Sequence, residues 1–418
     1  MDIDVLSNAA YTDGVPHHLL AQLRRDEPIY FQDVPDERLL GPAWVVTKHA
    51  HVIEASSMHE KMGNRHGLNL RASYSDDEGR HLLTLDGPEH IRQRRMTNTH
   101  FSPRAVRRYT DHYHDLAGAL LDDAIAGGGG TFDLVDDVAV PLPLLAICEL
   151  VGAPPTNIEQ IVRWSNAIIT NDDPEMAETE DVRTEAMGEM MEYITKLFAL
   201  RTSEPSDDLA SVLVAEVTAG KLAMEEAVSY AMLLFVAGNE TTRNNISHAV
   251  LQLARHPDQW KLLVDTVRAD PESAMLPTNP GTALGQLLDT AVEESIRWAS
   301  PVIYMRRTAY EDIDFHGVTF KAGDRVVLHY ASANRDEDVF GPTAGEFDIT
   351  RDPNPHVGFG FGRHICLGAH LARLETRAFL VELARRADSF KLVREPDFGR
   401  SSFVHTIKRL PVAMALTS

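Results

Sequence analysis

The segment of this sequence best suited to chemistry is a glycine-rich loop that ends in a cysteine, Cys366. Three alternating glycines stand in it: Gly358, Gly360 and Gly362. Residues 367–387 follow with the leucine spacing of a helix, so Cys366 is predicted at a helix N-terminus, where the dipole and free N–H groups favour a thiolate. Gly368 would let a flat, bulky group approach the backbone. A structural cysteine is the commoner explanation for an isolated residue, and no nucleotide-binding motif is present.

A second candidate for a functional site is a short polar segment inside an apolar helix. Residues 231–237 are all apolar, which predicts a helix buried on every side. Gly238, Glu240 and Thr241 follow; the glycine could open the helix locally, and the threonine could bond a backbone carbonyl or hold a water. An acid beside a hydroxyl in a nearly dry site is what proton delivery requires. A helix with polar residues facing a crevice or another subunit would show the same pattern.

Three further segments carry charged residues at suggestive spacings. His90 and Arg94 are four residues apart on one predicted helical face and could hold an anion together. Glu294 and Arg297 are three apart on another helix, and Arg307 stands at the start of a predicted strand pair. Each of these, taken alone, is also what a solvated surface would show.

Composition narrows the class of protein. The chain has 418 residues, with 40 Lys and Arg against 62 Asp and Glu, so its formal net charge is −22. This acidic balance argues against nucleic acid as a partner. The longest apolar run is far short of the roughly 20 residues that cross a bilayer, and the N-terminus has no secretory pattern, so we expect a cytoplasmic protein without a membrane anchor. The two cysteines, Cys148 and Cys366, exclude an iron–sulfur cluster and a disulfide framework.

The periodicity predicts a mainly α chain with small β pieces. Helical spacing dominates residues 86–275 and returns at 367–387, whereas residues 313–332 alternate as hairpin strands do. Residues 42–55 have the β-branched and aromatic content of a strand. At a usual size of about 150 residues per domain, the chain would have two or three domains. However, no linker divides the sequence.

Taken together, these five segments resemble the cytochrome P450 family, the haem-thiolate monooxygenases. The loop FGFGRHICLG is similar to the family's haem-binding loop, AGNETT to its oxygen-activating helix, and the Glu-x-x-Arg spacing at Glu294 and Arg297 to its structural motif. The order and spacing agree over nearly the whole chain. The resemblance implies one mainly α, roughly triangular domain over residues 1–418, with a small β-rich region and haem b buried at its centre.

Several residue roles are implied by the resemblance. Cys366 would be the axial thiolate ligand of the haem iron, with Phe359 beside the sulfur and Gly368 at the point of close approach. Glu240 and Thr241 match the family's acid–alcohol pair, which relays protons to dioxygen. Four residues would bind the two haem propionates: His90, Arg94, Arg307 and His364.

The resemblance also implies a structural triad and a substrate pocket. Glu294 and Arg297 would form the triad with His356, where many relatives have an arginine. The pocket would be apolar and suit a hydrophobic molecule of terpenoid, steroid, alkyl or aromatic type. Its lining would include Leu234, Phe235, Ala237, Val302, Ile303, Tyr304, Phe403 and Val404. Residues 63–80, Ile168 and Ile169 would lie nearby, and Arg65, His66 and Arg71 could meet a carboxylate.

The implied reaction converts RH, O₂, two electrons and two protons into ROH and water. We expect no fused flavin or ferredoxin module, and therefore a soluble, bacterial-type monomer served by a separate ferredoxin and an NAD(P)H-linked reductase. A basic patch would dock the ferredoxin: Arg92, Arg95, Arg363, Arg373 and Arg377. The alternatives are a peroxide-driven hydroxylase, against which the Glu240–Thr241 pair argues, and a haem-binding sensor or carrier without turnover.

Overall fold

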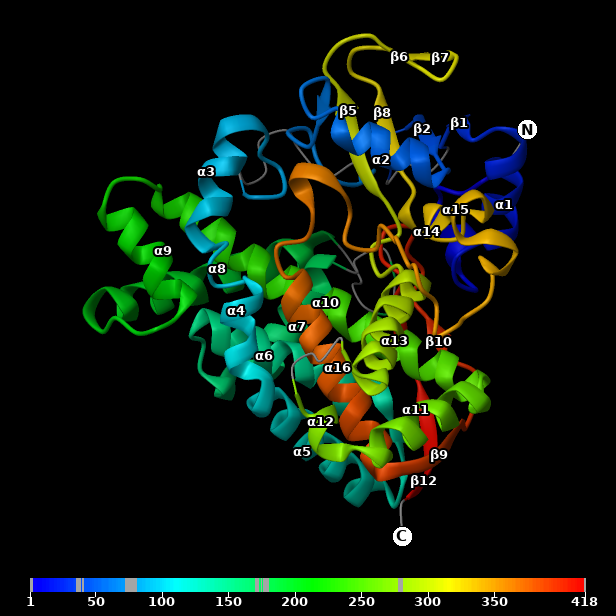
Figure 1. Cartoon of the computed structure of the whole chain (residues 1–418). Coiled ribbons are helices and arrows are strands. Elements are labelled where there is room, and N and C mark those ends of the chain that lie inside the picture. Colours follow the sequence, from blue (N-terminus) through cyan, green and yellow to red (C-terminus); the bar gives the residue numbers. More distant parts are fainter. Residues whose placement is uncertain are drawn as a thin grey trace.

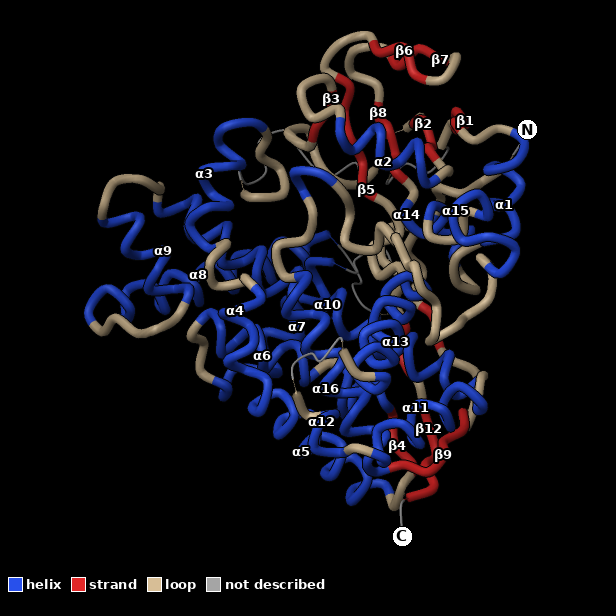
Figure 2. The backbone as a smooth tube through the Cα atoms, in the orientation of Figure 1, coloured by secondary structure: helices blue, strands red, loops and turns tan. Residues whose placement is uncertain are grey.

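The protein has a roughly triangular outline, and one long helix runs through its middle (Figure 1). The computed structural model describes residues 3–34, 39, 41–71, 81–169, 173, 175, 180–276 and 281–416. Helices fill most of the molecule, and strands gather at two corners, one near the N-terminus and one beside the C-terminus (Figure 2). This arrangement confirms the mainly α fold with a small β-rich region. Within the described ranges, no helix combines the length and the apolar character needed to span a membrane.

The long helices form the framework of the site. In chain order they are α1 (His17–Asp26), α2 (His49–Ser57), α3 (Gly87–Thr97), α5 (Thr110–Gly128), α6 (Pro141–Val151), α7 (Ile158–Ile169), α8 (Glu180–Ser203), α9 (Leu209–Thr218), α10 (Met224–Arg255), α11 (Pro257–Ala269), α13 (Ala283–Ala299) and α16 (Ala369–Arg386). Short helices connect them: α4 (Pro103–Val106), α12 (Pro271–Ala274), α14 (Tyr330–Ala333) and α15 (Glu337–Phe340). The helices predicted within residues 86–275 and at 367–387 are therefore confirmed.

The strands build one main sheet and three smaller units. The main sheet has the order β1-β2-β8-β5-β3, from β1 (Ile29–Gln32), β2 (Ala43–Val46), β8 (Arg325–Leu328), β5 (Met305–Ala309) and β3 (Met62–Gly63). Its β2 and β8 are parallel, whereas its other pairs are antiparallel. The smaller units are the hairpin of β6 (Ile313–Phe315) and β7 (Val318–Phe320), the sheet of β4 (Thr131–Asp133), β12 (Pro411–Leu416) and β9 (Ala387–Leu392), and the pair β10 (Asp397–Phe398) and β11 (Ile407–Arg409). The strand predicted from residue 42 ends at Val46, and α2 takes up the rest of that segment.

The central helix α10 is continuous through its glycine. Gly238 lies within Met224–Arg255, so the expected local opening of the helix does not occur. A Cβ at Gly238 would lie only 3.1 Å from Cγ1 of Ile147 on α6. The glycine therefore lets α6 approach α10 closely, and apolar side chains of both helices share one core cluster.

Two buried histidines make stability depend on pH. Burial lowers the pKa of His329 to about 3 and that of His405 to about 4. The unfolded chain therefore binds more protons than the folded chain below the ordinary pKa of about 6.5. The free energy of unfolding should be highest above about pH 6.5 and fall by up to about 1.4 kcal/mol per pH unit and histidine on acidification. Urea unfolding at about pH 7 and about pH 5 measures the difference, and equal stability at both would contradict the assignment.

Candidate active site

A cavity lies where α3, α10, α16 and the glycine-rich loop converge. Cys366 opens onto it, and the backbone N–H of Cys366 donates to the Phe359 carbonyl at 2.9 Å, which closes the loop. Gly360 and Gly362 have φ of 72° and 76°, values that only glycine adopts without strain. A Cβ on Gly368, which also lines the cavity, would meet no heavy atom of the described chain within 4 Å. Gly368 therefore leaves room for the flat, bulky group that was expected from the sequence.

The thiol of Cys366 is not activated by the chain alone. Burial raises its pKa, and the backbone N–H of Gly368 and the charges of Arg94 and Arg373 only partly oppose that effect. The backbone N–H at the helix start thus lowers the pKa of Cys366, but burial outweighs this effect. A metal ion that coordinates the sulfur would deprotonate it outright.

One end of the cavity is lined by the four residues that the sequence assigns to an anion. His90 and Arg94 come from α3, Arg307 from β5, and His364 from the turn just before Cys366. The His90 and His364 rings lie 4.2 Å apart. Both ring nitrogens of His90 are buried without a hydrogen-bond partner in the described part of the chain. Burial and the charges of His364 and Arg94 lower the pKa of His90 to about 4, so an anionic ligand is what this cluster lacks.

Asp86 holds this group of four residues in place. One carboxylate oxygen of Asp86 accepts from the Asn64 N–H at 2.9 Å and from the Tyr310 hydroxyl at 2.5 Å, and the other lies 3.3 Å from Nε2 of His364. Burial would raise the pKa of Asp86, but the bonds from His364 and Tyr310 lower it to about 2. Asp86 was not predicted from the sequence, although its position just before Gly87 and Pro88 is typical of a residue that begins a helix.

The predicted acid–alcohol pair is split between two surroundings. Thr241 lines the cavity, and its hydroxyl donates to the Ala237 carbonyl at 2.9 Å. Glu240 is fully buried outside the cavity lining, where it accepts from Arg243 at 2.8 Å and from the Asn244 side chain at 3.0 Å. Glu240 is not among the residues that line the cavity, whereas Thr241 and Thr242 both are. The role of Glu240 in the proton relay therefore stays a prediction.

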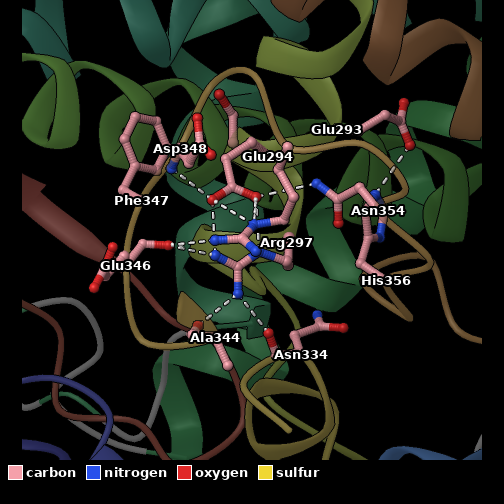
Figure 3. A network of polar contacts seen from close by, with 12 residues as sticks. Glu293, Glu294, Arg297, Asn334, Ala344, Glu346, Phe347, Asp348, Asn354 and His356 are labelled. Carbon is pink, nitrogen blue, oxygen red and sulfur yellow. Dashed lines mark hydrogen bonds and ion pairs between the residues drawn. The ribbon is translucent and has the colours of Figure 1, made fainter. Parts of the chain in front are cut away.

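The structural triad has a different third member from the one predicted. Glu294 and Arg297 form two hydrogen bonds of 2.7 Å, and Arg297 also donates to three backbone carbonyls, those of Asn334, Ala344 and Glu346 (Figure 3). Arg351 completes the triad, with its Nε 3.3 Å from Glu294. His356 contacts the neighbouring acid instead, because its Nε2 lies 3.0 Å from Glu293 (Figure 3). Adjacent acids on a helix face different directions, and spacing alone did not show which one His356 meets.

Known proteins resemble this chain along its whole length. The family model for cytochrome P450 matches residues 144–400. The chain belongs to the cytochrome P450 family. Linalool 8-monooxygenase of Pseudomonas putida is 35% identical over 98% of both chains. Methyl-branched lipid omega-hydroxylase of Mycobacterium tuberculosis is 38% identical over 96% of this chain and 92% of that protein. The Mycobacterium marinum P450 CYP268A2, solved with pseudoionone, superposes with a TM-score of 0.88 at 32% identity and covers 99% of each chain.

The family assignment makes this P450 a monooxygenase, an oxidoreductase, and implies haem with a cysteine thiolate as its axial ligand. The residues present fit that group. Cys366 is available as the ligand, Gly368 leaves room beside it, and the partnerless nitrogens of His90 face the end where propionates would lie.

Three of the eight residues predicted to line the substrate pocket line this cavity. Leu234, Ala237 and Val302 line the cavity of the P450. Phe235 instead faces the ring of Tyr193 on α8, with centroids 6.5 Å apart. The remaining predicted residues are not among those that line the cavity: Ile303, Tyr304 and Phe403 pack in the core cluster of the N-terminal segment, and Val404 forms a β-bridge with Val302. Strand-like segments alternate their side chains between faces, and the sequence did not show which face meets the cavity.

Residues near the cavity mouth also differ from expectation. Asn64 and Leu68 line it, whereas Arg65 stacks on the Tyr310 ring at 3.7 Å and Arg71 donates to the Ile168 carbonyl. Residues 72–80 and the side chain of Ile169 lie outside the described residues. Apolar residues that were not predicted from the sequence also line the cavity, among them Leu82, Leu83, Phe101, Leu233 and Met305.

The predicted basic patch is largely neutralised by acids. Arg92 pairs with Glu89 at 2.9 Å, Arg373 with Glu293, and Arg377 with Asp289 at 2.8 Å. In the described part of the chain, Arg95 and Arg363 form no ion pair with an acid. The net positive charge of the patch is therefore smaller than that of five unpaired arginines.

Proposed function

We propose that this P450 inserts one oxygen atom of O₂ into a C–H bond of a hydrophobic molecule with a branched aliphatic chain, using electrons from a separate ferredoxin and its reductase. The proposal rests on one observation: Cys366, the cationic end and an apolar wall beside Thr241 share one cavity. The balanced reaction converts RH, O₂, two electrons and two protons into ROH and water.

The chain's own residues have separate tasks in this reaction. Cys366 would hold the haem iron. Arg94 and Arg307 would hold the propionates through charge-assisted hydrogen bonds, together with the rings of His90 and His364. Haem, when bound, supplies the redox chemistry that activates O₂. The apolar wall excludes water and orients the substrate. The Thr241 hydroxyl can hold a water or pass a proton at its Oγ1 atom.

The lining of the cavity supports a branched aliphatic substrate. Most of the side chains that line the cavity are apolar, among them several leucines, Val302 and Met305. An apolar lining of this kind favours hydrophobic ligands. The relatives act, by name, on linalool, on C26 of a steroid and on the omega position of a methyl-branched lipid. Branched aliphatic carbon is what these three share.

The surface beside Cys366 supports docking of a protein electron donor. Phe361 and Ile365 expose large apolar side chains there, and Arg363 stands between them in the sequence. An apolar centre with a charged rim is typical of protein interfaces. With most of the arginine patch paired, apolar contact contributes more to this docking than charge does.

Replacing Thr241 with alanine tests the proposed function. The variant should keep haem, substrate binding and NAD(P)H consumption, but release hydrogen peroxide in place of product. Losing a hydrogen bond worth about 1 kcal/mol should raise the ratio of hydrogen peroxide to product by roughly five- to tenfold. The assay reconstitutes the enzyme with a ferredoxin and its reductase, and measures product and hydrogen peroxide per NAD(P)H, with substrates chosen by the shift of the haem Soret band.

The matched control is Thr241→Ser, which keeps a hydroxyl and should stay coupled. If Thr241→Ala still forms product with every NAD(P)H consumed, a group other than Thr241 performs this role in the cavity. Product formed only with added hydrogen peroxide would indicate the peroxide-driven hydroxylase. A wild-type protein that neither shifts its Soret band nor consumes NAD(P)H would indicate a haem sensor or carrier.

A further inference from the structure

Glu293, the acid just before the buried triad, binds two side chains that both reach the glycine-rich loop ending at Cys366. Its carboxylate accepts from Nε of Arg373 at 2.5 Å and from Nη2 of the same side chain at 2.8 Å. Nε2 of His356 lies 3.0 Å from the same carboxylate (Figure 3). Burial would raise the pKa of Glu293, but the bonds from Arg373 and His356 lower it to about 2. The acid therefore carries its negative charge at neutral pH.

Both partners of this acid hold the beginning of the glycine-rich loop. Nδ1 of His356 accepts from the Gly358 N–H at 3.1 Å, so the other ring nitrogen donates to the acid. The guanidinium of Arg373 lies 4.6 Å from the centre of the Phe359 ring, within the range of a cation–π contact. The Phe359 carbonyl in turn accepts from the Cys366 N–H at 2.9 Å. The two contacts therefore fix the stretch of backbone that holds the sulfur.

Arg373 also acts on the sulfur through its charge. Burial raises the pKa of Cys366, and Arg373 is one of the two arginines whose charges oppose that effect. A positive charge near the sulfur favours ferrous over ferric haem, because reduction adds one negative charge to the iron–thiolate unit. Glu293 neutralises part of this positive charge. The two paired side chains are only 28% and 35% exposed, so solvent screens their charges less than it would at the surface.

A second ion pair joins the same two helices without reaching the loop. Arg377, one helical turn after Arg373 on α16, pairs at 2.8 Å with Asp289, one turn before Glu293 on α13. Among the described residues, the arginine charges that act on the pKa of Cys366 do not include that of Arg377. The two pairs have the same chemistry and the same helices, so the second is a matched control for the first.

We propose that Glu293 is a positioning residue of the haem site, which fixes the loop of Cys366 through Arg373 and His356 and sets the reduction potential of the haem by balancing the charge of Arg373. The inference requires haem bound through Cys366, but it does not depend on the substrate or the electron donor proposed above. The electron that reduces the haem comes from outside the protein, and Glu293 keeps its charge throughout.

Potentiometric titration of the haem-loaded protein, with dithionite and small redox mediators, tests this role without substrate or donor. Glu293→Gln leaves the charge of Arg373 unbalanced and should shift the equilibrium toward ferrous haem by about three- to tenfold, which raises the potential by about 30–60 mV. Arg373→Gln should shift it by a similar factor in the opposite direction. Arg373→Lys keeps the charge and should stay close to the wild type. Asp289→Asn, the matched control, should leave the potential unchanged.

The sign of the shifts separates this role from a merely structural one, because a defect in folding does not follow the sign of the charge removed. Shifts in the same direction in Glu293→Gln and Arg373→Gln, or no shift in either, would overturn the proposal. An equal shift in Asp289→Asn would overturn it as well. If Glu293→Gln loses its haem, the two Arg373 variants decide: a potential lowered by Gln and kept by Lys supports the proposal, and any other result overturns it.

The reduced carbon monoxide spectrum distinguishes failure of this proposal from failure of the proposed function. A wild type without the band of thiolate-ligated haem would overturn the role of Glu293 together with the assignment of Cys366. A wild type that has this band and the expected potentials, but oxidises no substrate, would contradict only the proposed function.

Discussion

Replacing Glu294 with alanine should lower the free energy of unfolding by about 3–5 kcal/mol, the cost of breaking a buried ion pair from one side. Glu294 and Arg297 are both fully buried, and Arg351 shares the same carboxylate. Removing the carboxylate leaves two guanidinium charges without their acid. Urea unfolding of the haem-loaded protein measures the loss.

The effect should extend to the haem site. Arg297 holds the carbonyls of Asn334, Ala344 and Glu346, and the Asp348 N–H donates to Glu294 (Figure 3). These contacts fix the segment that leads into the cysteine loop, so Glu294→Ala should also weaken haem retention.

An exposed pair of the same spacing provides the control. Glu89 and Arg92 are three residues apart on α3 and partly solvent-exposed. Replacing Glu89 with alanine should cost at most about 1 kcal/mol, as for other surface pairs. Similar losses in the two variants would show that the buried triad does not stabilise the fold.

Local patterns predicted the parts of this protein whose chemistry lies within one segment. The glycine spacing before Cys366 is needed because Gly360 and Gly362 have left-handed φ and a Cβ at Gly358 would clash with Ile296. The pairing of Glu294 with Arg297 follows from helical geometry alone. These features require no knowledge of tertiary contacts.

The sequence was least informative where a contact depends on which way a side chain faces. Glu240 and Thr241 are neighbours in sequence, but only Thr241 meets the cavity. Glu293 and Glu294 are also neighbours, and His356 contacts the first, whereas Arg351 contacts the second. Helix rotation and packing against distant segments decide such cases, and one sequence without relatives carries little information about either.

Glu375, a buried acid that lines the cavity, was not predicted for a related reason. It stands in a helix with a charged, ordinary-looking sequence, LARLETRAF, in which an acid is expected to face solvent. The packing of α16 against α10 and α5 encloses it. The signal that could have found it is its position nine residues after Cys366, on a helix that must begin at the cavity.

Replacing Cys366 with histidine should change the axial ligand of the haem, the largest spectroscopic change that a single substitution can make here. The thiolate donates electron density to the iron, whereas an imidazole is a neutral ligand. Cys148, the other cysteine, is buried among apolar side chains of α6, and burial raises its pKa to about 12. Cys148→Ser is therefore the matched control, because it removes a thiol that holds no metal.

The reduced carbon monoxide complex is the most direct test of this site. The wild type and Cys148→Ser should absorb at the long wavelength typical of thiolate-ligated haem, and Cys366→His should absorb where imidazole-ligated haem does. A wild-type spectrum without the long-wavelength band, or a Cys366→His spectrum that retains it, would contradict the assignment of Cys366 as the haem ligand.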